Sequence, residues 1–326
     1  MAPAAVTRCH GHSVGIVYRV TMSVIPTAEA YAELRPYVFS IAYRMVGSVT
    51  EAEDLVQEAF LRLHRAVGDG EEVESPRAYL ATVVTRLAID HLRSARSRRE
   101  TYVGSWLPEP LVGATDDVAA AAELADSLSV AFLVVLETLS PVERAVFLLR
   151  EVFDFGYDEI ATIVGRSEAN CRQIAVRARR HVEARRPRFD PSPERREELA
   201  DRFFAAAQEG DTDALVELLA ADAAIYGDGG GRAPALRRPA RGAARVARLL
   251  SQWARLGARG GIGGERVTVN GQPGLRITDA EGRTLSVMAL QVDDGRIAAI
   301  HSIINPDKLR HLGPVGNAWG FLRRDG

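Results

Sequence analysis

The sequence predicts a multidomain chain in which two all-α domains are followed by one α+β domain. Its 326 residues are too many for one small core and suggest two or three domains. Up to a proline-containing boundary at residues 186 to 193, apolar residues recur at helical spacing. Beyond it, alternating segments separated by Asn-Gly, Glu-Gly and Asp-Gly pairs predict a curved antiparallel sheet.

The composition is that of a soluble globular protein, with 47% hydrophobic and 26% charged residues. Cys9 and Cys171 are far apart and predict neither a disulfide framework nor a metal site. No apolar run reaches the roughly 18 residues of a membrane span. We therefore expect a cytoplasmic protein without cofactor, metal or membrane contact. Residues 1 to 27 are expected to form a disordered extension, with Met22 as a candidate true start.

The net charge of −2 conceals a segregation of charge along the chain. Residues 166 to 188 contain eight arginines and two acidic residues, whereas residues 103 to 143 contain seven acidic residues and no basic one. Partners are therefore inferred segment by segment. Lys308 is the single lysine among 41 basic residues, so arginine richness alone carries little information.

The first two helices are predicted at residues 30 to 46 and 49 to 66. The second has acidic residues in its first turns, near the positive end of the helix dipole, and apolar residues that can face inward. Taken alone, this is the pattern of an ordinary amphipathic helix. The acidic residues are Glu51, Glu53, Asp54 and Glu58.

The next helix is predicted from Ser75-Pro76 to about Arg99, with arginines denser toward its end. Basic residues there complement the helix dipole and would also follow a phosphate backbone. A solvated basic tail explains the pattern equally well. Tyr79 either stacks on a base or, as we favour, packs in the core.

An acidic linker is predicted at residues 101 to 128. Pro108 and Pro110 favour extended backbone, so the piece SWLPEPL should be stiff. We expect Trp106 to be exposed and to need a surface that covers it.

Residues 140 to 180 predict a helix-turn-helix. Ser140 and Glu143 form a capping box, a short second helix stops at Gly165, and Ser167 caps a third helix. The outer side of the third helix can bond to phosphates and base edges of DNA. The alternative is a solvated basic helix of an unrelated bundle. The outer residues are Asn170, Arg172, Gln173, Arg177, Arg179 and Arg180.

The C-terminal part is predicted to mix helices and strands. Helices are expected at residues 194 to 208, 212 to 220 and 243 to 256. Strands are expected at residues 223 to 226, 266 to 269, 274 to 278, 285 to 292 and 297 to 304.

The N-terminal segments resemble the group IV, or extracytoplasmic-function, sigma factors of bacterial RNA polymerase. The resemblance rests on AEDLVQEAFLRLHRA, SPRAYLATVVTRLAIDHLR, an acidic spacer, and LSPVERAVFLLREV before the helix-turn-helix. It implies region 2 at residues 28 to 100, which would bind the core RNA polymerase clamp helices and the minus-ten promoter element. It implies region 4 at residues 129 to 188, which would read the minus-thirty-five element.

The resemblance also assigns roles to single residues. In sigma factors the equivalent linker threads polymerase channels built for nucleic acid, which suits its acidic charge. Polymerase binding is implied for Asp54, Gln57, Glu58 and Phe60. Promoter DNA binding is implied for Arg77, Tyr79, Arg86, Arg93, Arg96, Ser167, Asn170, Arg172, Gln173, Arg177, Arg179 and Arg180.

Residues 194 to 312 resemble the SnoaL-like domains of the nuclear transport factor 2-like fold, a cone whose helices close over a bent sheet and leave a pocket. Residues 313 to 326 remain as a tail. Together with WLPEP, DGGG and NPDKL, this resembles one subgroup of sigma factors in which the extension is regarded as a fused regulator. The regulatory contacts implied are Trp106, Pro108, Glu109, Pro110, Asp228, Gly229, Gly230, Gly231, Asn305, Pro306, Asp307, Lys308 and Leu309.

Two alternatives belong to other functional classes. A stand-alone helix-turn-helix repressor would have no use for the docking helix. A cone-fold enzyme would need a general acid or base in an apolar pocket. We favour ligand sensing over turnover, and predict a non-enzymatic sigma factor regulated in cis. The candidate groups for an enzyme are Asp222, Asp228, Asp293 and His301, with Trp253 and Met288 as candidate pocket lining.

Overall fold

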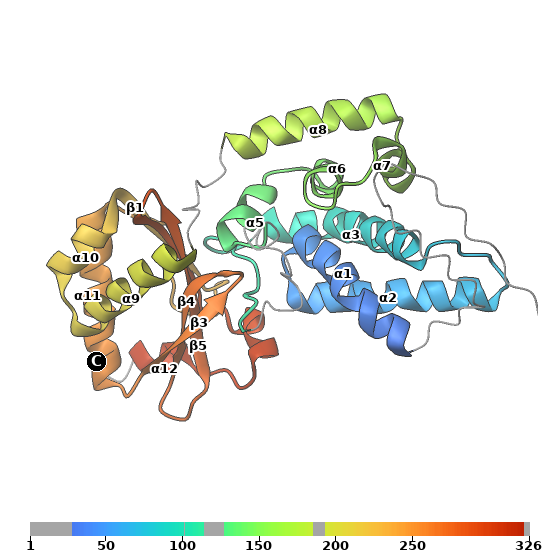
Figure 1. The fold of residues 1–326 in the computed structure, drawn as a ribbon. Coiled ribbons are helices and arrows are strands. Elements are labelled where there is room, and N and C mark those ends of the chain that lie inside the picture. Colours follow the sequence, from blue (N-terminus) through green and yellow to red (C-terminus); the bar gives the residue numbers. More distant parts are fainter. Residues whose placement is uncertain (1–27, 101, 114–126, 185–192, 323–326) are drawn as a thin grey trace, which may run out of the picture.

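The computed structural model describes residues 28–100, 102–113, 127–184 and 193–322 (Figure 1). The predicted N-terminal extension and Met22 lie outside them. Figure 1 shows a helical half and a half built around a sheet. None of the described helices could cross a membrane. In the same part of the chain, no group of three His, Cys, Asp or Glu residues could hold a metal ion.

The first three helices form a bundle close to the predicted bounds. They are α1 (Ala28–Val46), α2 (Val49–Gly68) and α3 (Pro76–Glu100). Ser48 caps α2 by accepting a hydrogen bond from the backbone N–H of Glu51. The buried faces of all three helices meet in one hydrophobic core.

Four helices follow the linker: α5 (Val130–Leu136), α6 (Pro141–Glu151), α7 (Tyr157–Val164) and α8 (Glu168–Glu183). The capping box of Ser140 and Glu143 is present, and the helix-turn-helix prediction is confirmed. Helix α5 was not predicted, because its sequence VAFLVVL is apolar on every side and lacks periodicity. Residues of α5 and α6 share the core of α1–α3. The two predicted helical domains are therefore packed together.

The C-terminal half contains one six-stranded sheet with strand order β2-β1-β6-β5-β4-β3. Its helices are α9 (Pro193–Glu209), α10 (Thr212–Leu218) and α11 (Ala243–Arg259). Its strands are β1 (Leu219–Asp228), β2 (Ala240–Arg241), β3 (Gly263–Val269), β4 (Gln272–Thr278), β5 (Thr284–Asp293) and β6 (Arg296–Ile303). Short helices η1 (Pro306–Lys308), η2 (Arg310–Leu312) and α12 (Ala318–Leu322) end the described chain.

The expectation of a purely antiparallel sheet is wrong, because β1 and β6 run parallel. The chain between them includes α11 and four strands, which is long enough for a parallel crossover. Local alternation predicts a strand but not the strand beside it. The two-residue strand β2 was too short to be predicted.

The two faces of the sheet pack against different partners. Helices α9, α10 and α11 cover one face and share a core with Leu290, Val292 and Ile300. Val287, Ala289 and Ile303 alternate with these residues and face the other way, toward Leu107 of the linker and Val130 of α5. The sheet therefore lies between its own helices and the helical half (Figure 1).

Candidate functional site

Helix α8 presents the outer face that the sequence predicts. Ser167 accepts a hydrogen bond from the backbone N–H of Asn170 and starts the helix. Cys171, Ile174 and Ala175 are buried in the helix-turn-helix core. All the predicted DNA-contact residues of this element are exposed: Ser167, Asn170, Arg172, Gln173, Arg177, Arg179 and Arg180.

Two arginines on this face form surface ion pairs. A guanidinium nitrogen of Arg172 lies 2.6 Å from a carboxylate oxygen of Glu168. Arg179 pairs in the same way with Glu151 at 2.5 Å. Exposed pairs contribute about 1 kcal/mol or less, so a phosphate or a base edge can replace the carboxylate.

The residues predicted to bind DNA on α3 have different surroundings. Arg77 is exposed, with its guanidinium carbon 3.8 Å from the ring centre of Tyr37. Arg93 is exposed and pairs with Asp90 at 3.2 Å. Tyr79 is half-buried against the helical core, as we favoured. The side chain of Arg96 lies outside the described residues.

Arg86 of α3 binds the helix-turn-helix. Its guanidinium donates to the backbone carbonyls of Ile163 at 3.0 Å and Thr162 at 2.8 Å, at the carbonyl end of α7. A cation there is favoured by the helix dipole and satisfies carbonyls that the helix leaves unpaired. In this arrangement Arg86 holds α3 and α7 together.

Arg144 of α6 makes a second connection between the helical domains. It is 3% exposed and donates to the backbone carbonyl of Met45, at the end of α1, at 2.6 Å. It also pairs with Glu137 at 2.6 Å. The helix-turn-helix is thus fastened to both α1 and α3.

The predicted polymerase-binding residues divide into surface and core positions. Asp54 and Gln57 are exposed. Glu58 pairs with Arg62 at 2.8 Å, and this hydrogen bond lowers the pKa of the Glu58 carboxyl. Phe60 is 7% exposed, with its ring centre 4.5 Å from that of Tyr31. Phe60 supports the helix from inside, because its position falls on the apolar stripe of α2.

The expectation that Trp106 is exposed is wrong. Its ring rests on Gly47, between α1 and α2, and the side chain is half-buried. A Cβ at position 47 would lie 2.7 Å from the Trp106 ring, and the φ angle of 69° also favours glycine. Pro108 and Pro110 are buried as well. The linker is therefore covered along this piece.

Glu109 fastens the linker to the start of α2. Its carboxylate accepts hydrogen bonds from the backbone N–H groups of Val49 at 2.8 Å and Thr50 at 3.1 Å, and from the Ser48 hydroxyl at 2.9 Å. A helix N-terminus favours a negative charge at this place. The Glu109 carbonyl accepts a further bond from the Tyr43 hydroxyl at 2.6 Å.

A buried cluster around Asp228 holds the other side of the linker. The fully buried Asp228 carboxylate accepts hydrogen bonds from the Tyr102 hydroxyl at 2.5 Å and the Leu107 backbone N–H at 2.8 Å. Lys308 pairs with it at 2.7 Å and also donates to the Leu107 carbonyl. Asn305 donates to the Tyr102 hydroxyl at 2.9 Å. The DGGG and NPDKL segments thus meet around one linker peptide.

The other predicted regulatory residues surround this cluster. Burial and the neighbouring Asp228 raise the pKa of Tyr102, so its hydroxyl stays a donor. Gly230 has a φ angle of 57°, and a Cβ there would collide with Asn305 and Tyr102. Gly229 is buried, Gly231 faces Val103, Pro306 and Asp307 lie in the turn capped by Asn305, and Leu309 packs in the cluster that contains Leu107.

Sequence reasoning missed Asn270, which joins three parts of the chain. Its side-chain amide donates to the Tyr43 hydroxyl at 2.7 Å and the Leu128 carbonyl at 3.0 Å. Its oxygen accepts from the Leu111 backbone N–H at 3.0 Å. The Asn-Gly pair signalled only a hairpin turn, and no local pattern indicates distant partners.

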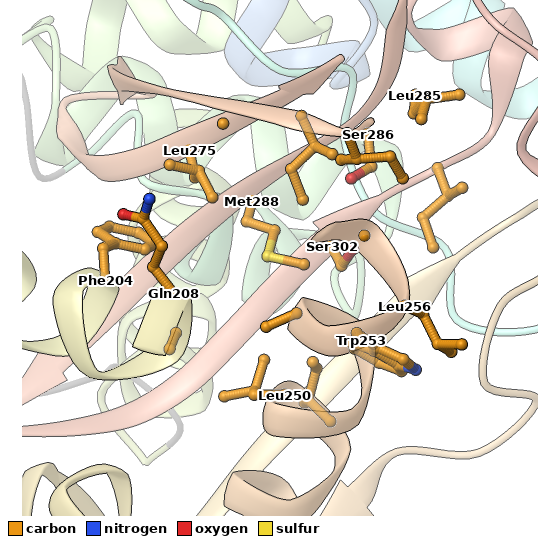
Figure 2. A pocket seen from close by; sticks show the side chains of 18 of the residues that line it. Phe204, Gln208, Leu250, Trp253, Leu256, Leu275, Leu285, Ser286, Met288 and Ser302 are labelled. Atoms are coloured by element: carbon orange, nitrogen blue, oxygen red, sulfur yellow. The ribbon is translucent and has the colours of Figure 1, made fainter. Parts of the chain in front are cut away.

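The C-terminal domain contains an apolar pocket of about 790 Å³ between the sheet and helices α9 and α11 (Figure 2). Trp253 and Met288 line it, as expected. The four candidate acid–base groups do not: Asp222, Asp228, Asp293 and His301. His301 lies on the opposite face of the sheet, stacked on Tyr226, and burial lowers its pKa to about 4.

Comparisons with known proteins match this organisation. The family model Sigma-70 region 2 matches residues 30–98, and the model Sigma-70, region 4 matches residues 129–182. The extracytoplasmic-function (ECF) RNA polymerase sigma factor SigJ of Mycobacterium tuberculosis is 40% identical over 289 residues, which cover 85% of this chain and 91% of SigJ. The probable ECF sigma factor SigI of the same species is 35% identical over 295 residues, which cover 88% of this chain and 96% of SigI.

A solved structure has the same arrangement of helical half and C-terminal domain. The crystal structure of M. tuberculosis SigJ matches 87% of this chain and 98% of that chain. The TM-score is 0.70 and the sequence identity is 36%. The match spans the helical half and the C-terminal domain together.

The Asp228–Lys308 pair generates a prediction about stability. Lys308→Met should lower the free energy of unfolding by roughly 3 kcal/mol, because it leaves a buried carboxylate without its counter-charge. Asp228→Asn combined with Lys308→Met should cost less than the sum of the single changes. Urea unfolding of the four proteins measures this coupling, and simple additivity would contradict the pair.

His301 generates a prediction about pH. Its folded-state pKa of about 4 lies below the unfolded value of about 6.5. Above pH 6.5 the residue adds no pH dependence. As the pH falls toward 4, the unfolded chain binds a proton that the folded chain does not, so stability falls by up to about 1.4 kcal/mol per pH unit.

His301→Gln should therefore flatten the dependence of the urea midpoint on pH between about 6.5 and 4. Replacing the exposed His64 with Gln is the control for the loss of one histidine. Equal slopes for the wild type and His301→Gln would refute the buried neutral imidazole.

Proposed function

Because the chain belongs to the extracytoplasmic-function family of RNA polymerase sigma factors, we propose that its C-terminal domain holds the sigma regions in a closed, weakly active arrangement. The chain is a sigma factor that binds core RNA polymerase and promoter DNA. The observation that carries the proposal is the linker peptide at Leu107, clasped by Asp228 and Lys308. We call these contacts of Asp228 and Lys308 with Leu107 the clamp. Because the linker joins the two sigma regions, the clamp restrains both of them.

The spacing of the promoter elements supports this proposal. Elements named minus-ten and minus-thirty-five lie about 25 base pairs apart, or roughly 85 Å of duplex at 3.4 Å per base pair. Helix α7 packs on α3 through Arg86, and α8 follows α7 directly (Figure 1). Helices pack about 10 Å apart, so α8 lies roughly two layers, or about 20 Å, from α3. The two regions must separate before they can bind both elements.

The contacts inside the closed arrangement compete with promoter binding. Arg86, a candidate for the minus-ten element, is occupied by the carbonyls of α7. The linker also has to leave the N-terminus of α2, where Glu109 is bound, if it is to enter a polymerase channel. Polymerase and promoter would then replace these internal contacts, which is a shift between two populations.

The remaining assignments follow the family resemblance. We assign minus-ten binding to α3, minus-thirty-five binding to α8 and polymerase docking to the exposed side of α2, in the bacterial cytoplasm. Sigma factors act by binding, and we propose that the C-terminal domain catalyses no reaction. The apolar lining of its pocket supports this, since the candidate acid–base groups lie elsewhere.

The first functional prediction concerns base contacts by α8. Arg172→Ala or Gln173→Ala should weaken binding to the cognate promoter by about 1 to 3 kcal/mol and relax sequence preference there. Arg180→Ala should weaken cognate and unrelated DNA alike and reduce the salt dependence. Fluorescence anisotropy with both duplexes at several salt concentrations distinguishes the two effects. Unchanged promoter choice in Arg172→Ala would contradict the assignment of α8.

The second prediction concerns polymerase docking. Asp54→Arg combined with Glu58→Arg should abolish core polymerase binding by reversing interface charge, with little effect on stability because both positions lie at the surface. Changing the exposed Glu71 and Glu72 to Arg makes the same change in charge beyond α2 and is the control. Holoenzyme assembly at wild-type affinity by the Asp54/Glu58 variant would place docking elsewhere.

The third prediction tests the clamp. A chain that ends before Asn305 lacks Lys308 and should give more run-off transcript with core polymerase than the full-length protein. Tyr102→Phe removes a hydroxyl that makes two hydrogen bonds, one to Asp228 and one from Asn305, and should raise transcription at least about fivefold, since a single hydrogen bond contributes about 1 kcal/mol. Tyr31→Phe, on α1 away from the linker, is the control.

A chain that ends at Arg188 separates two roles of the C-terminal domain. It should lack the clamp and also any promoter contacts that the domain supplies. If the full-length protein, the chain ending before Asn305 and Tyr102→Phe all transcribe equally, the clamp does not restrain the sigma regions.

A further inference from the structure

The pocket of the C-terminal domain has the lining of a small-molecule site. Figure 2 shows aromatic and aliphatic side chains from the helices facing others from the sheet. Its volume of about 790 Å³ falls within the usual range for ligand pockets. Phe204 and Trp253 are aromatic residues of this lining, and Ser286 and Ser302 carry hydroxyl groups.

The charges at the pocket are already neutralised. Among its described lining residues, Asp201 and Arg266 are the charged ones, and they pair with each other at 3.2 Å. Arg266 also pairs with Glu197 at 2.9 Å, and its guanidinium carbon lies 4.5 Å from the ring centre of Phe204. A charged ligand would find no free counter-ion here, so the lining favours a neutral molecule.

One buried polar group lies in the wall of this apolar space without a hydrogen-bond partner among the described residues. Ser302 is 2% exposed, and its hydroxyl has no hydrogen-bond partner among the residues that the structure describes. Figure 2 shows it in the pocket together with Ser286 and Met288. A buried hydroxyl without a partner costs free energy, which a ligand with a hydroxyl, carbonyl or N–H group would recover.

The strands that form the pocket also carry the clamp. Gly227 of β1 and Ser302 of β6 are paired in register and line the pocket. The next pair, Asp228 and Ile303, points to the opposite face, where Asp228 binds the linker. Adjacent residues of the same two strands therefore contribute to the pocket and to the clamp.

One loop touches both sites. It leaves β1 at Asp228, and Gly230 lies against Asn305 and Tyr102. Arg232 pairs with Asp307 of the NPDKL segment at 2.8 Å. The same loop then contributes residues 234 to 236 to the pocket wall. A molecule that packs against this wall would hold the loop in the shape that presents Asp228 to the linker.

We propose that the pocket binds a neutral, largely apolar, ring-containing molecule that bonds to Ser302, and that this ligand strengthens the closed arrangement. The effect of this ligand on transcription rests on the clamp proposed above. A ligand favours the state to which it binds more tightly, and the pocket wall described here belongs to the closed state. The ligand is therefore a co-inhibitor of transcription.

Binding is tested on the full-length protein with N-phenyl-1-naphthylamine, a neutral aromatic amine that fluoresces in apolar surroundings. Ala254→Phe fills the pocket from α11 and should weaken binding at least tenfold. Gln252→Phe adds the same ring to the exposed side of α11 and is the matched control. Ser302→Ala should weaken binding roughly fivefold, the equivalent of one hydrogen bond. Equal affinity of the wild type and Ala254→Phe would overturn the site.

Regulation is tested by run-off transcription with and without a saturating concentration of the same amine. The wild type and Gln252→Phe should lose transcription severalfold, and Ala254→Phe should not respond. If the amine binds in the pocket without lowering wild-type transcription while Tyr102→Phe raises it, the coupling is wrong and the clamp stands. If Tyr102→Phe changes nothing, the clamp fails, and the Ala254→Phe titration still decides the binding site.

Discussion

The arrangement of this protein depends on a buried ion pair, Asp228–Lys308, whose hydrogen bonds are complete only when the linker is docked. Burying two charges is costly unless their remaining hydrogen-bonding groups are also satisfied. Here the linker satisfies them: Tyr102 and the Leu107 N–H bind Asp228, while the Leu107 carbonyl binds Lys308. The C-terminal domain alone would leave part of this cluster unpaired. The electrostatics of the pair therefore favour the docked linker.

Further buried polar contacts connect the docked linker and the C-terminal domain to the helical half. Glu109 binds the N-terminus of α2, and Asn270 reaches Tyr43 in α1. Within that half, Arg86 and Arg144 fasten the helix-turn-helix to α3 and α1. Some of these groups belong to elements that a sigma factor needs for polymerase and DNA. In the proposed activation, contacts with polymerase and DNA would replace these internal contacts, and about 5.5 kcal/mol of differential binding is enough to reverse a 99:1 preference between two states.

The sheet separates two environments by the alternation of its side chains. One face holds the apolar pocket, and the other faces the linker and α5. His301 and Asp228, the most buried of the candidate acid–base groups, point to the linker face. Asp228 therefore supports interdomain contact, His301 packs on Tyr226 within the sheet, and the pocket is left suited to apolar binding.

The sequence by itself determined the features that depend on near neighbours in the chain. These are the caps at Ser48, Ser140 and Ser167, the basic outer face of α8, and the WLPEP, DGGG and NPDKL segments. Only the tertiary structure decided which distant groups meet. Lys308 and Leu107 are 201 residues apart, Asn270 and Tyr43 are 227 apart, and β1 lies parallel to β6. Such pairings depend on how whole elements pack, which local propensity and periodicity do not encode.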